Sequence, residues 1–453
     1  MRLFSAGRPL RLRSGAAVAV AVGLLTAGLA APALAADDPP QTDQLSVGAQ
    51  TDQALPLGTD GGPAQALVLG VGIHHDNENF TVTDGRLTVD VSGLSGVAEV
   101  TWPDNCTPSG TNAVCDIPVV PTTGAHQVLL TVRAADGAEV GAQGRITYEA
   151  TATGGPDGIL TAPHDSYATT LTVGSGPDLA IAPLADIENA RPGDERTIPF
   201  KVTNNGNESA NGLTVTLYTS YGLTDLTQYD ACTYTAPDTN AYPPTTTAHC
   251  TFDQELAPGD CFELPAPLKV RLSPHALAER LDIDVEPGNG AQDLDSRNDY
   301  TALQIRAENT ADFSVTGDAI SGAAGETATA ELTFKNNGPA WVGHLGSGDP
   351  VAVVRLIVPT GTKVTGVPSG CYPHTLDGGY YPRPAGAPRY DCYLPYWVLE
   401  DTQRTLAFSV RVDTMVPGAT GAVSIHPSFG EFGEYENTFD PDLTNNTAVL
   451  TVN

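Results

Sequence analysis

Apolar and polar residues alternate strictly along two stretches of this chain. In residues 327–334, TATAELTF, every second side chain is apolar, and residues 197–203, TIPFKVT, repeat the pattern with Ile198, Phe200 and Val202 on one side. A period of two predicts β-strands with one face in a core and the other in solvent. Pro199 falls on the outward side, where its missing N–H predicts a sheet edge or a bulge.

Each of these predicted strands runs into the same three residues, Asn-Asn-Gly, at 204–206 and again at 336–338. Asn and Gly tolerate positive φ, so the motif predicts a tight reversal where the strand ends. Its repetition predicts that this reversal lies at equivalent places in two copies of one domain.

Further landmarks predict three units rather than two. A Val-Arg step inside an alternating run occurs at Val132, Val270 and Val410, and residues 293–305 (DLDSRNDYTALQI) resemble residues 440–452 (DPDLTNNTAVLTV). Short strands separated by Gly and Pro predict an all-β chain of three tandem immunoglobulin-like β-sandwich domains. The predicted ranges are 45–175 for the first and most divergent sandwich, 176–307 for the second and 308–453 for the third.

Three local features complete this prediction. The joins between the units are short, which predicts an elongated rod with restricted hinges. In the first unit, residues 70–85 (GVGIHHDNENFTVTDG) stand where the Asn-Asn-Gly turn would be, so a different connection is expected there. The sequence SPHALAER has an N-cap residue, Ser273, followed by Pro, which predicts a single helical turn.

The N-terminus has the three parts of a secretory signal. Four Arg residues precede a small-residue apolar run, and an Ala-Leu-Ala site ends at Ala35. We therefore expect residues 1–35 to be removed by cleavage between Ala35 and Ala36, and residues 36–44 to form a disordered N-terminus. The chain carries no sorting signal or apolar tail at its C-terminus, so the mature product is expected to be secreted, without an integral membrane segment and with at most noncovalent attachment to the cell wall.

The net charge of the chain limits the classes of partner that it is expected to bind. The full sequence has a formal net charge of −31, and removal of the four leader Arg residues leaves 18 basic and 53 acidic residues, a net charge of −35. Repulsion from phosphate excludes nucleic acid and anionic lipid as expected partners. Cell-wall or extracellular polysaccharide, or another extracellular protein, stays open.

The seven Cys residues of an exported chain are first expected to form disulfides. Pairing within each unit gives three bridges, each worth roughly 2–4 kcal/mol in the chain-entropy account: Cys106–Cys115, Cys232–Cys250 and Cys371–Cys392. Cys261 is then unpaired. It could compete for Cys232, bridge to another chain or stay free, and we favour a free thiol packed in the core.

Candidate chemistry is sparse. The sequence contains no HExxH, GxSxG or phosphate-cradling Gly-Lys motif, so no catalytic residue, cofactor or metal site is predicted. His74, His75 and Asp76 are interpreted as a solvated turn. The acidic stretches around Asp293, Asp295 and Asp299 and around Asp440 and Asp442 have spacing that leaves calcium open, but Asx turns explain the same residues without an ion.

Aromatic residues concentrate between Cys371 and Trp397, in GCYPHTLDGGYYPRPAGAPRYDCYLPYW. Exposed rings in a Gly- and Pro-rich loop would form a stacking surface for sugars or extended peptides. The alternative is that the loop folds back and its rings cap the third sandwich. The candidate binding residues are Tyr380, Tyr381, Tyr390, Tyr393, Tyr396 and Trp397.

An alternating strand followed by NNGP, a Cys before LAPGD, a Val-Arg strand and a closing DLTNNTAVLTV resemble the conserved-repeat domains of bacterial secreted and surface proteins. That family of unknown function is similar to bacterial cell-adhesion-related domains, and the leader resembles those of high-GC actinobacteria. The resemblance implies an immunoglobulin-like sandwich in an extracellular, non-catalytic role. It carries over no catalytic residue.

Two function classes therefore stay open. The first is a secreted, non-enzymatic repeat protein that acts as a structural, adhesion or ligand-binding module at the cell exterior. The second is an extracellular carbohydrate-binding accessory or hydrolase that uses the aromatic loop of the third unit.

Overall fold

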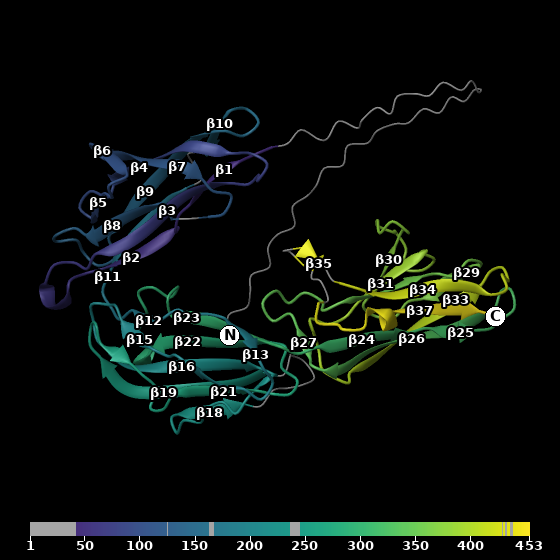
Figure 1. Cartoon of the computed structure of the whole chain (residues 1–453). Helices are drawn as coiled ribbons and strands as arrows, with labels where there is room; N and C mark the ends of the chain where they lie inside the picture. The colour runs from purple at the N-terminus through teal and green to yellow at the C-terminus, as the bar shows by residue number, and fades with distance from the viewer. Residues whose placement is uncertain are drawn as a thin grey trace, which may run out of the picture.

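The computed structural model describes residues 42–124, 126–162, 167–235, 245–427, 429–430, 433–434 and 438–453, and these are almost entirely β-strands (Figure 1). Buried apolar side chains form three separate clusters, which fall within residues 45–173, 179–305 and 311–452. We call the surrounding regions the first, second and third units. The all-β, immunoglobulin-like fold class is thereby confirmed.

The first unit packs two sheets against each other. One has the strand order β1-β3-β8-β5 and the other β2-β11-β9-β4-β7-β6, with β10 paired to β9. Their bounds are β1 (Leu45–Gly48), β2 (Asp52–Pro56), β3 (Leu67–His75), β4 (Val82–Gly93), β5 (Ala98–Thr101), β6 (Cys106–Ser109), β7 (Asn112–Val120), β8 (Val128–Ala134), β9 (Gln143–Thr153), β10 (Ile159–Ala162) and β11 (Ala168–Gly174), with a 3-10 helix η1 (Thr59–Gly61).

The second unit has one continuous sheet, β13-β23-β22-β16-β19-β18, and an opposite layer divided into β12-β15-β20 and β14-β21-β17. The strand that contains Pro199 is interrupted between Ile198 and Val202, which divides this layer. The bounds are β12 (Leu179–Ile181), β13 (Ile187–Ala190), β14 (Glu195–Ile198), β15 (Val202–Asn204), β16 (Ala210–Ser220), β17 (Leu223–Thr224), β18 (Cys232–Thr235), β19 (Thr245–Leu256), β20 (Cys261–Phe262), β21 (Leu268–Leu272), β22 (Ala278–Pro287) and β23 (Tyr300–Ala307), with η3 (Gly288–Gly290).

The third unit pairs the sheet β24-β26-β33-β29 with the sheet β25-β37-β34-β28-β31-β30, and two short ladders, β27-β32 and β35-β36, lie outside them. The bounds are β24 (Ala311–Thr316), β25 (Asp318–Ile320), β26 (Thr327–Pro339), β27 (Val342–Gly343), β28 (Val353–Ile357), β29 (Thr362–Gly366), β30 (Cys371–His374), β31 (Arg389–Tyr393), β32 (Trp397–Val398), β33 (Gln403–Val412), β34 (Ala419–His426), β35 (Phe429–Gly430), β36 (Gly433–Glu434) and β37 (Thr447–Val452), with η4 (Leu443–Asn446).

The same topology recurs in the three units. In each, an early strand adds in parallel to the last strand of the unit, as β2 does to β11, β13 to β23 and β25 to β37. The rest of the pairing is antiparallel, and the strands alternate buried and outward positions as expected; β9, for example, buries every second residue. A strand buried on one face satisfies its polar groups through the ladder and contributes its apolar face to the core.

The Asn-Asn-Gly motif does not form the tight reversal that the sequence predicted. In the third unit β26 continues through the motif to Pro339, and its pairing with β24 shifts register between Ala311 and Phe313. Of the residues in the two motifs, only Gly338 has a positive φ, of 75°. The motif therefore accompanies a β-bulge in the third unit and a bend after β15 in the second.

The three predicted disulfides are present, and each occupies the same position. Cys106 and Cys115 join β6 to β7, and the other two bridges join β18 to β19 and β30 to β31. In every case the edge strand of the larger sheet is tied to its neighbour within that sheet. An edge strand has unpaired backbone groups on one side, and the bridge holds it in register.

Two further expectations are wrong. Ser273 begins a turn, not a helical turn, and its hydroxyl accepts a hydrogen bond from the His275 amide at 3.1 Å. The N-terminal segment is ordered from within the range expected to be disordered, because the side chain of Asp43 is buried against His75. The expected leader and its cleavage site at Ala35 and Ala36 lie outside the described residues.

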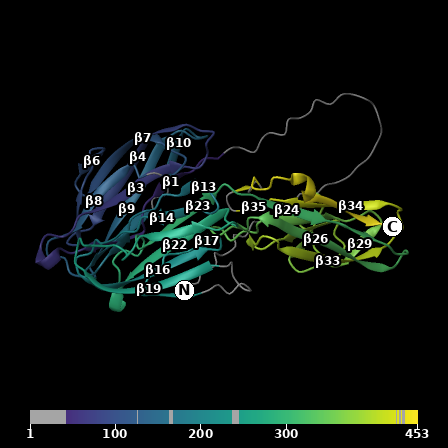
Figure 2. The same cartoon turned by 60° about the horizontal axis from the view of Figure 1, so that its bottom comes forward.

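The second and third units lie end to end, whereas the first unit turns back alongside the second in both views (Figures 1 and 2). The chain changes direction between β11 and β12, so the three units do not continue as one straight rod. A polar cleft lies at this first junction, and a densely packed contact joins the second and third units.

Candidate ligand-binding site

Among the described residues of the third unit, the most exposed aromatic rings lie on the hairpin formed by β30 and β31. Tyr372 on β30 and Tyr393 on β31 are 56% and 42% exposed, and their rings meet edge to face with centroids 5.6 Å apart. Tyr380, at the base of the connecting loop, is 84% exposed and forms a β-bridge with His374. We call Tyr372, Tyr380 and Tyr393 the tyrosine surface.

Two other tyrosines of this segment face inward. Tyr390 is fully buried, packs on Phe408 and donates a hydrogen bond from its hydroxyl to Pro384 O at 3.1 Å. The Tyr381 hydroxyl donates to Gly386 O at 2.9 Å, and its half-buried ring packs on the core of the unit. The prediction that Tyr390 contacts a ligand is therefore wrong, since its ring forms part of the core.

The remaining candidates lie beside the hairpin, not on it. Tyr396 and Trp397 are partly buried, and Trp397 is in β32, which pairs with β27. Tyr372, absent from the predicted binding set, belongs to the exposed pair. The alternation of side chains on either side of the disulfide could have distinguished the buried rings from the exposed ones. Cys371 and Cys392 point inward, so Tyr390, two residues before Cys392, points inward too. Tyr372 and Tyr393, each next to a Cys, point outward.

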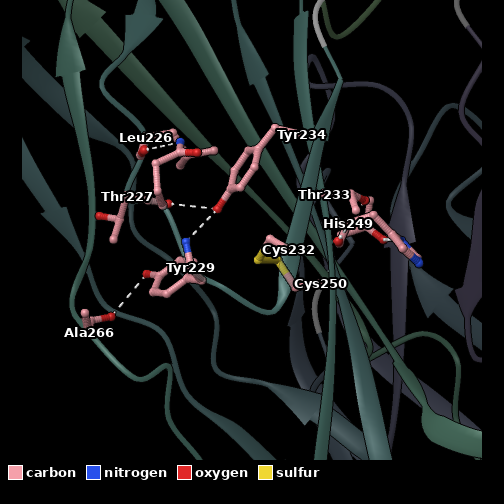
Figure 3. The surroundings of a disulfide bond; sticks show 11 residues. Leu226, Thr227, Tyr229, Cys232, Thr233, Tyr234, His249, Cys250 and Ala266 are labelled. Carbon is pink, nitrogen blue, oxygen red and sulfur yellow. Dashed lines mark hydrogen bonds between the residues drawn. A yellow bond between two sulfur atoms is a disulfide. The ribbon is translucent and has the colours of Figure 1, made fainter.

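The corresponding hairpin of the second unit uses its tyrosines differently (Figure 3). The Tyr234 hydroxyl donates to Thr227 O at 3.2 Å and accepts from the Tyr229 amide at 2.9 Å. Burial raises the pKa of Tyr229 to about 12, and its hydroxyl donates to Ala266 O at 3.1 Å. Both side chains fasten the loop before the Cys232–Cys250 bridge, so neither of these two rings is free to form an exposed pair like that of the third unit.

A largely buried ion pair lies beside the tyrosine surface, because Asp391 pairs directly opposite Tyr372 on the same face of the hairpin. Asp391, between Tyr390 and Tyr393 on β31, accepts hydrogen bonds from the Nε atoms of Arg355 and Arg389, each at 2.9 Å, and from their Nη2 atoms. Burial alone would raise the pKa of Asp391, but these hydrogen bonds and the two positive charges outweigh it and lower the pKa to about 2. The carboxylate thus fixes β28 to β31 beside the exposed rings.

This ion pair predicts a pH-dependent contribution to stability. Because the pKa of Asp391 is lower in the folded chain than the usual aspartate value of 3.8, its contribution is complete above pH 3.8 and is lost as the pH falls towards 2. The contribution amounts to about 2 kcal/mol. We expect Asp391→Asn to lower the free energy of unfolding of the third unit at pH 6, and the difference from the wild type to shrink by about 2 kcal/mol at pH 2.

Chemical denaturation at both pH values measures this difference. Asp413→Asn is the matched control, because Asp413 also pairs with an arginine, Arg411, but in solvent. An Asp391→Asn deficit that stays constant between pH 6 and pH 2 would contradict the prediction.

A serine and a histidine also meet on this face of the third unit. The Oγ of Ser424 lies 2.8 Å from Nε2 of His426, both on β34. The same Nε2 lies 3.3 Å from Nη1 of Arg355, so the ring nitrogen that faces the serine also faces an arginine.

Two residues singled out in the sequence behave differently from expectation. His74 and His75 end β3, and His75 is 2% exposed with Nδ1 at 3.1 Å from Oδ2 of Asp43, so the expected solvated turn is wrong. Cys261 is free but exposed, on the edge strand β20, with Thr203 Oγ1 3.5 Å from its sulfur. The favoured buried thiol is therefore wrong, because its strand position points the sulfur outward.

The acidic residues near the ends of the second and third units accept hydrogen bonds from backbone amides. Asp293 Oδ2 accepts from the Leu179 amide at 2.7 Å, and Asp440 Oδ2 accepts from the Phe313 amide at 3.3 Å. Each carboxylate thus joins the last part of a unit to its first strand. The other oxygen of each closes an Asx turn, accepting from the amide two residues on at 2.9 Å for Asp293 and 3.1 Å for Asp440. No group of three or more His, Cys, Asp or Glu side chains among the described residues is arranged to hold a metal ion.

No family model matches this sequence, and no curated protein matches it. Among solved structures, the Dpr2 Ig1-Ig2 complex with DIP-Theta Ig1-Ig3 is similar at 10% identity with a TM-score of 0.24, covering 90% of this chain and 99% of that one. A putative membrane-anchored protein from Corynebacterium diphtheriae is similar at 10% identity with a TM-score of 0.19, covering 90% and 95%. The titin fragment I67-I69 is similar at 7% identity with a TM-score of 0.18, covering 91% and 97%.

Similarity at this level carries no argument about function, and the fold class stands on the strand order itself. In the part of the chain that the structure describes, no helix is long and apolar enough to span a membrane.

Proposed function

We propose that this chain is a secreted, non-enzymatic protein of the cell exterior, a structural or adhesion module that holds cell-wall or extracellular polysaccharide on the tyrosine surface of its third unit. The observation that carries this proposal is the exposed edge-to-face pair of Tyr372 and Tyr393, with Tyr380 on the same hairpin. Rings held at a stapled sheet edge offer a large contact area at a small cost in conformational entropy.

Three further properties support an extracellular role. The disulfides are typical of chains that fold in an oxidising compartment, and the repeated immunoglobulin-like fold is typical of structural and adhesion proteins. The large negative charge disfavours nucleic acid and anionic lipid. A neutral polysaccharide is compatible with all three.

Retention on immobilised polysaccharide tests the proposal. The full chain is applied to insoluble peptidoglycan, chitin and cellulose, and we expect retention on at least one of them. Simultaneous replacement of Tyr372, Tyr380 and Tyr393 by Ala should weaken this retention at least about tenfold, since each exposed ring contributes on the order of 1 kcal/mol.

Tyr218→Ala is the matched control, because Tyr218 is 43% exposed but lies on β16 in the second unit. This variant should bind as the wild type does. If the triple variant is retained as strongly as the wild type, or if no polysaccharide retains the wild type, the proposal is wrong.

A further inference from the structure

The first and second units enclose a cleft of about 710 Å³ that the tyrosine surface does not reach. One wall comes from β2, the start of β3 and the segment before it, and the other from the Asn-Asn-Gly bend and the segment before β23. Four hydrogen bonds between described residues join the walls, among them Gln65 Nε2 to Gly206 O at 3.1 Å and Arg297 Nη2 to Gln53 Oε1 at 2.8 Å.

The cleft is lined by polar groups that the protein itself leaves unused. The side-chain amides of Gln50 and Asn205 both line it, and among the contacts of the described residues none engages either of them. Asn298 also lines the cleft, but its Nδ2 donates to Asp178 Oδ1 at 2.9 Å and its unpartnered Oδ1 is buried, so it does not add to the groups open to a ligand. Unengaged amides offer both donors and acceptors, which hydroxyl groups match.

The charge of the lining selects against anions. Among the described residues that line it, Asp178 and Asp295 are charged and none is Lys or Arg, although Arg297, which pairs with Asp295 at 2.6 Å, lies beside them. Burial raises the pKa of Asp178 to about 6, with Asp293 and Asp295 adding like charge. A phosphorylated or carboxylated ligand would meet repulsion here, whereas a neutral ligand would not.

The backbone of the cleft disfavours a bound peptide strand. The carbonyl of Asp52 accepts from Arg297 Nη1 at 2.6 Å, and the carbonyl of Ala54 accepts from Gln53 Nε2 at 3.0 Å. These acceptors of β2 are therefore taken, and an added strand would lack them. Val68, which is 65% exposed, supplies an apolar surface of the kind that packs against the C–H face of a sugar ring.

We propose that the cleft between the first and second units is a binding site for a neutral oligosaccharide. The amides of Gln50 and Asn205 hold its hydroxyl groups, and Val68 packs against a ring face. This site is separate from the tyrosine surface and does not depend on it.

Titration calorimetry of the full chain tests this site with cellohexaose, xylohexaose, mannohexaose and maltohexaose as neutral probes, and with hexagalacturonate and a neutral hexapeptide as comparators. At least one neutral hexasaccharide should bind, and neither comparator should. Gln50→Ala combined with Asn205→Ala should weaken that binding about tenfold, because each lost hydrogen bond contributes about 0.5–1.5 kcal/mol.

Both residues are exposed, so the double variant is expected to fold, and circular dichroism verifies this. Three results would overturn the proposal: no neutral probe binds, a comparator binds as well as the neutral probes, or the double variant keeps full affinity. Affinity lost only when Tyr372, Tyr380 and Tyr393 are replaced would also overturn the cleft site while supporting the tyrosine surface, so the two proposals fail separately.

Discussion

Replacing Trp341 by Ala is expected to lower the free energy of unfolding of the third unit by about 3–5 kcal/mol. Trp341 is fully buried where the second and third units meet, and its Nε1 donates a hydrogen bond to Oε1 of Glu279 in the second unit at 2.6 Å. Its backbone amide donates to His275 O at 3.1 Å. The substitution therefore removes both a large apolar side chain and a contact between units.

The expected loss of stability is large because the buried carboxylate of Glu279 needs its hydrogen-bond donors. This carboxylate is 1% exposed, and burial raises its pKa. It accepts hydrogen bonds from the Ser220 hydroxyl, from the Gly222 amide at 2.9 Å and from the Leu277 amide at 3.1 Å, in addition to Trp341. A buried carboxylate that loses one of its donors keeps its desolvation penalty without the compensating bond.

Differential scanning calorimetry measures this effect. We expect the second and third units to unfold in one shared transition in the wild type, and the Trp341→Ala variant to show the third unit unfolding earlier in a transition of its own. Trp341→Phe keeps most of the apolar volume and removes only the N–H donor, so its loss should be about 1–3 kcal/mol.

Trp102→Ala is the control for losing a tryptophan elsewhere, because Trp102 packs on the core of the first unit. It should leave the shared transition of the other two units intact. If Trp341→Ala leaves that transition unsplit, the junction does not couple the two units.

The two junctions therefore differ in kind. Around Trp341, the Tyr221 ring lies edge to face at 5.6 Å, and its hydroxyl donates to Glu400 of the third unit at 2.8 Å, so rings and hydrogen bonds are buried together. At the first junction the contacts are polar, and the side chain of Arg297, which makes two of them, is 42% exposed. Exposed polar contacts contribute little, so we expect the first junction to yield before the second.

Much of the fold follows from patterns that act over a few residues. Alternation in residues 327–334 depends only on the period of a strand, and it correctly predicts β26. The disulfides follow because each pair closes a single hairpin, where Cys371 and Cys392, for example, lie directly opposite each other. Local geometry is enough in both cases.

The candidate site could be predicted only in part, because it depends on partners far apart in the sequence. Arg355 lies directly opposite Asp391 on the neighbouring strand, 36 residues away, and no spacing in the sequence indicates that contact. The cleft needs two units to be placed against each other, so neither wall predicts it alone. The prediction for Tyr390 is wrong for a more local reason, because the register of β31 decides which face of the sheet each of its side chains occupies.

In the first unit, a histidine occupies the position that the first Asn of the motif occupies in the other two units. His75 pairs opposite Leu45, Asn204 opposite Leu179 and Asn336 opposite Phe313, so the three side chains occupy one position of the fold. All three are buried. The sequence predicted a different connection here, yet the position is conserved in space and filled by a histidine paired with Asp43. The role of this position is to satisfy polar groups between the first strand and its neighbour.

The second large effect is expected at this position in the third unit. Replacing Asn336 by Leu should lower the free energy of unfolding by about 2–5 kcal/mol, because several buried groups lose their partners together. Asn336 Nδ2 donates to Ala340 O at 2.9 Å and to Leu399 O at 3.1 Å, while its Oδ1 accepts from the Gly338 amide at 3.0 Å. Leu has a similar volume, so the loss measures the hydrogen bonds and not a cavity.

A substitution of the next residue of the motif distinguishes a hydrogen-bonding role for Asn-Asn-Gly from a turn-forming role. Asn337 is exposed, and its Nδ2 bonds Asp312 and Ser314 at the surface, so Asn337→Ala should cost no more than about 1 kcal/mol in urea unfolding. If Asn-Asn-Gly were repeated for its turn conformation, the two substitutions would cost similar amounts. A large loss at Asn336 alone would mean that the motif recurs because of its first Asn, whose side-chain amide bonds the segment after β26 to the segment before β33.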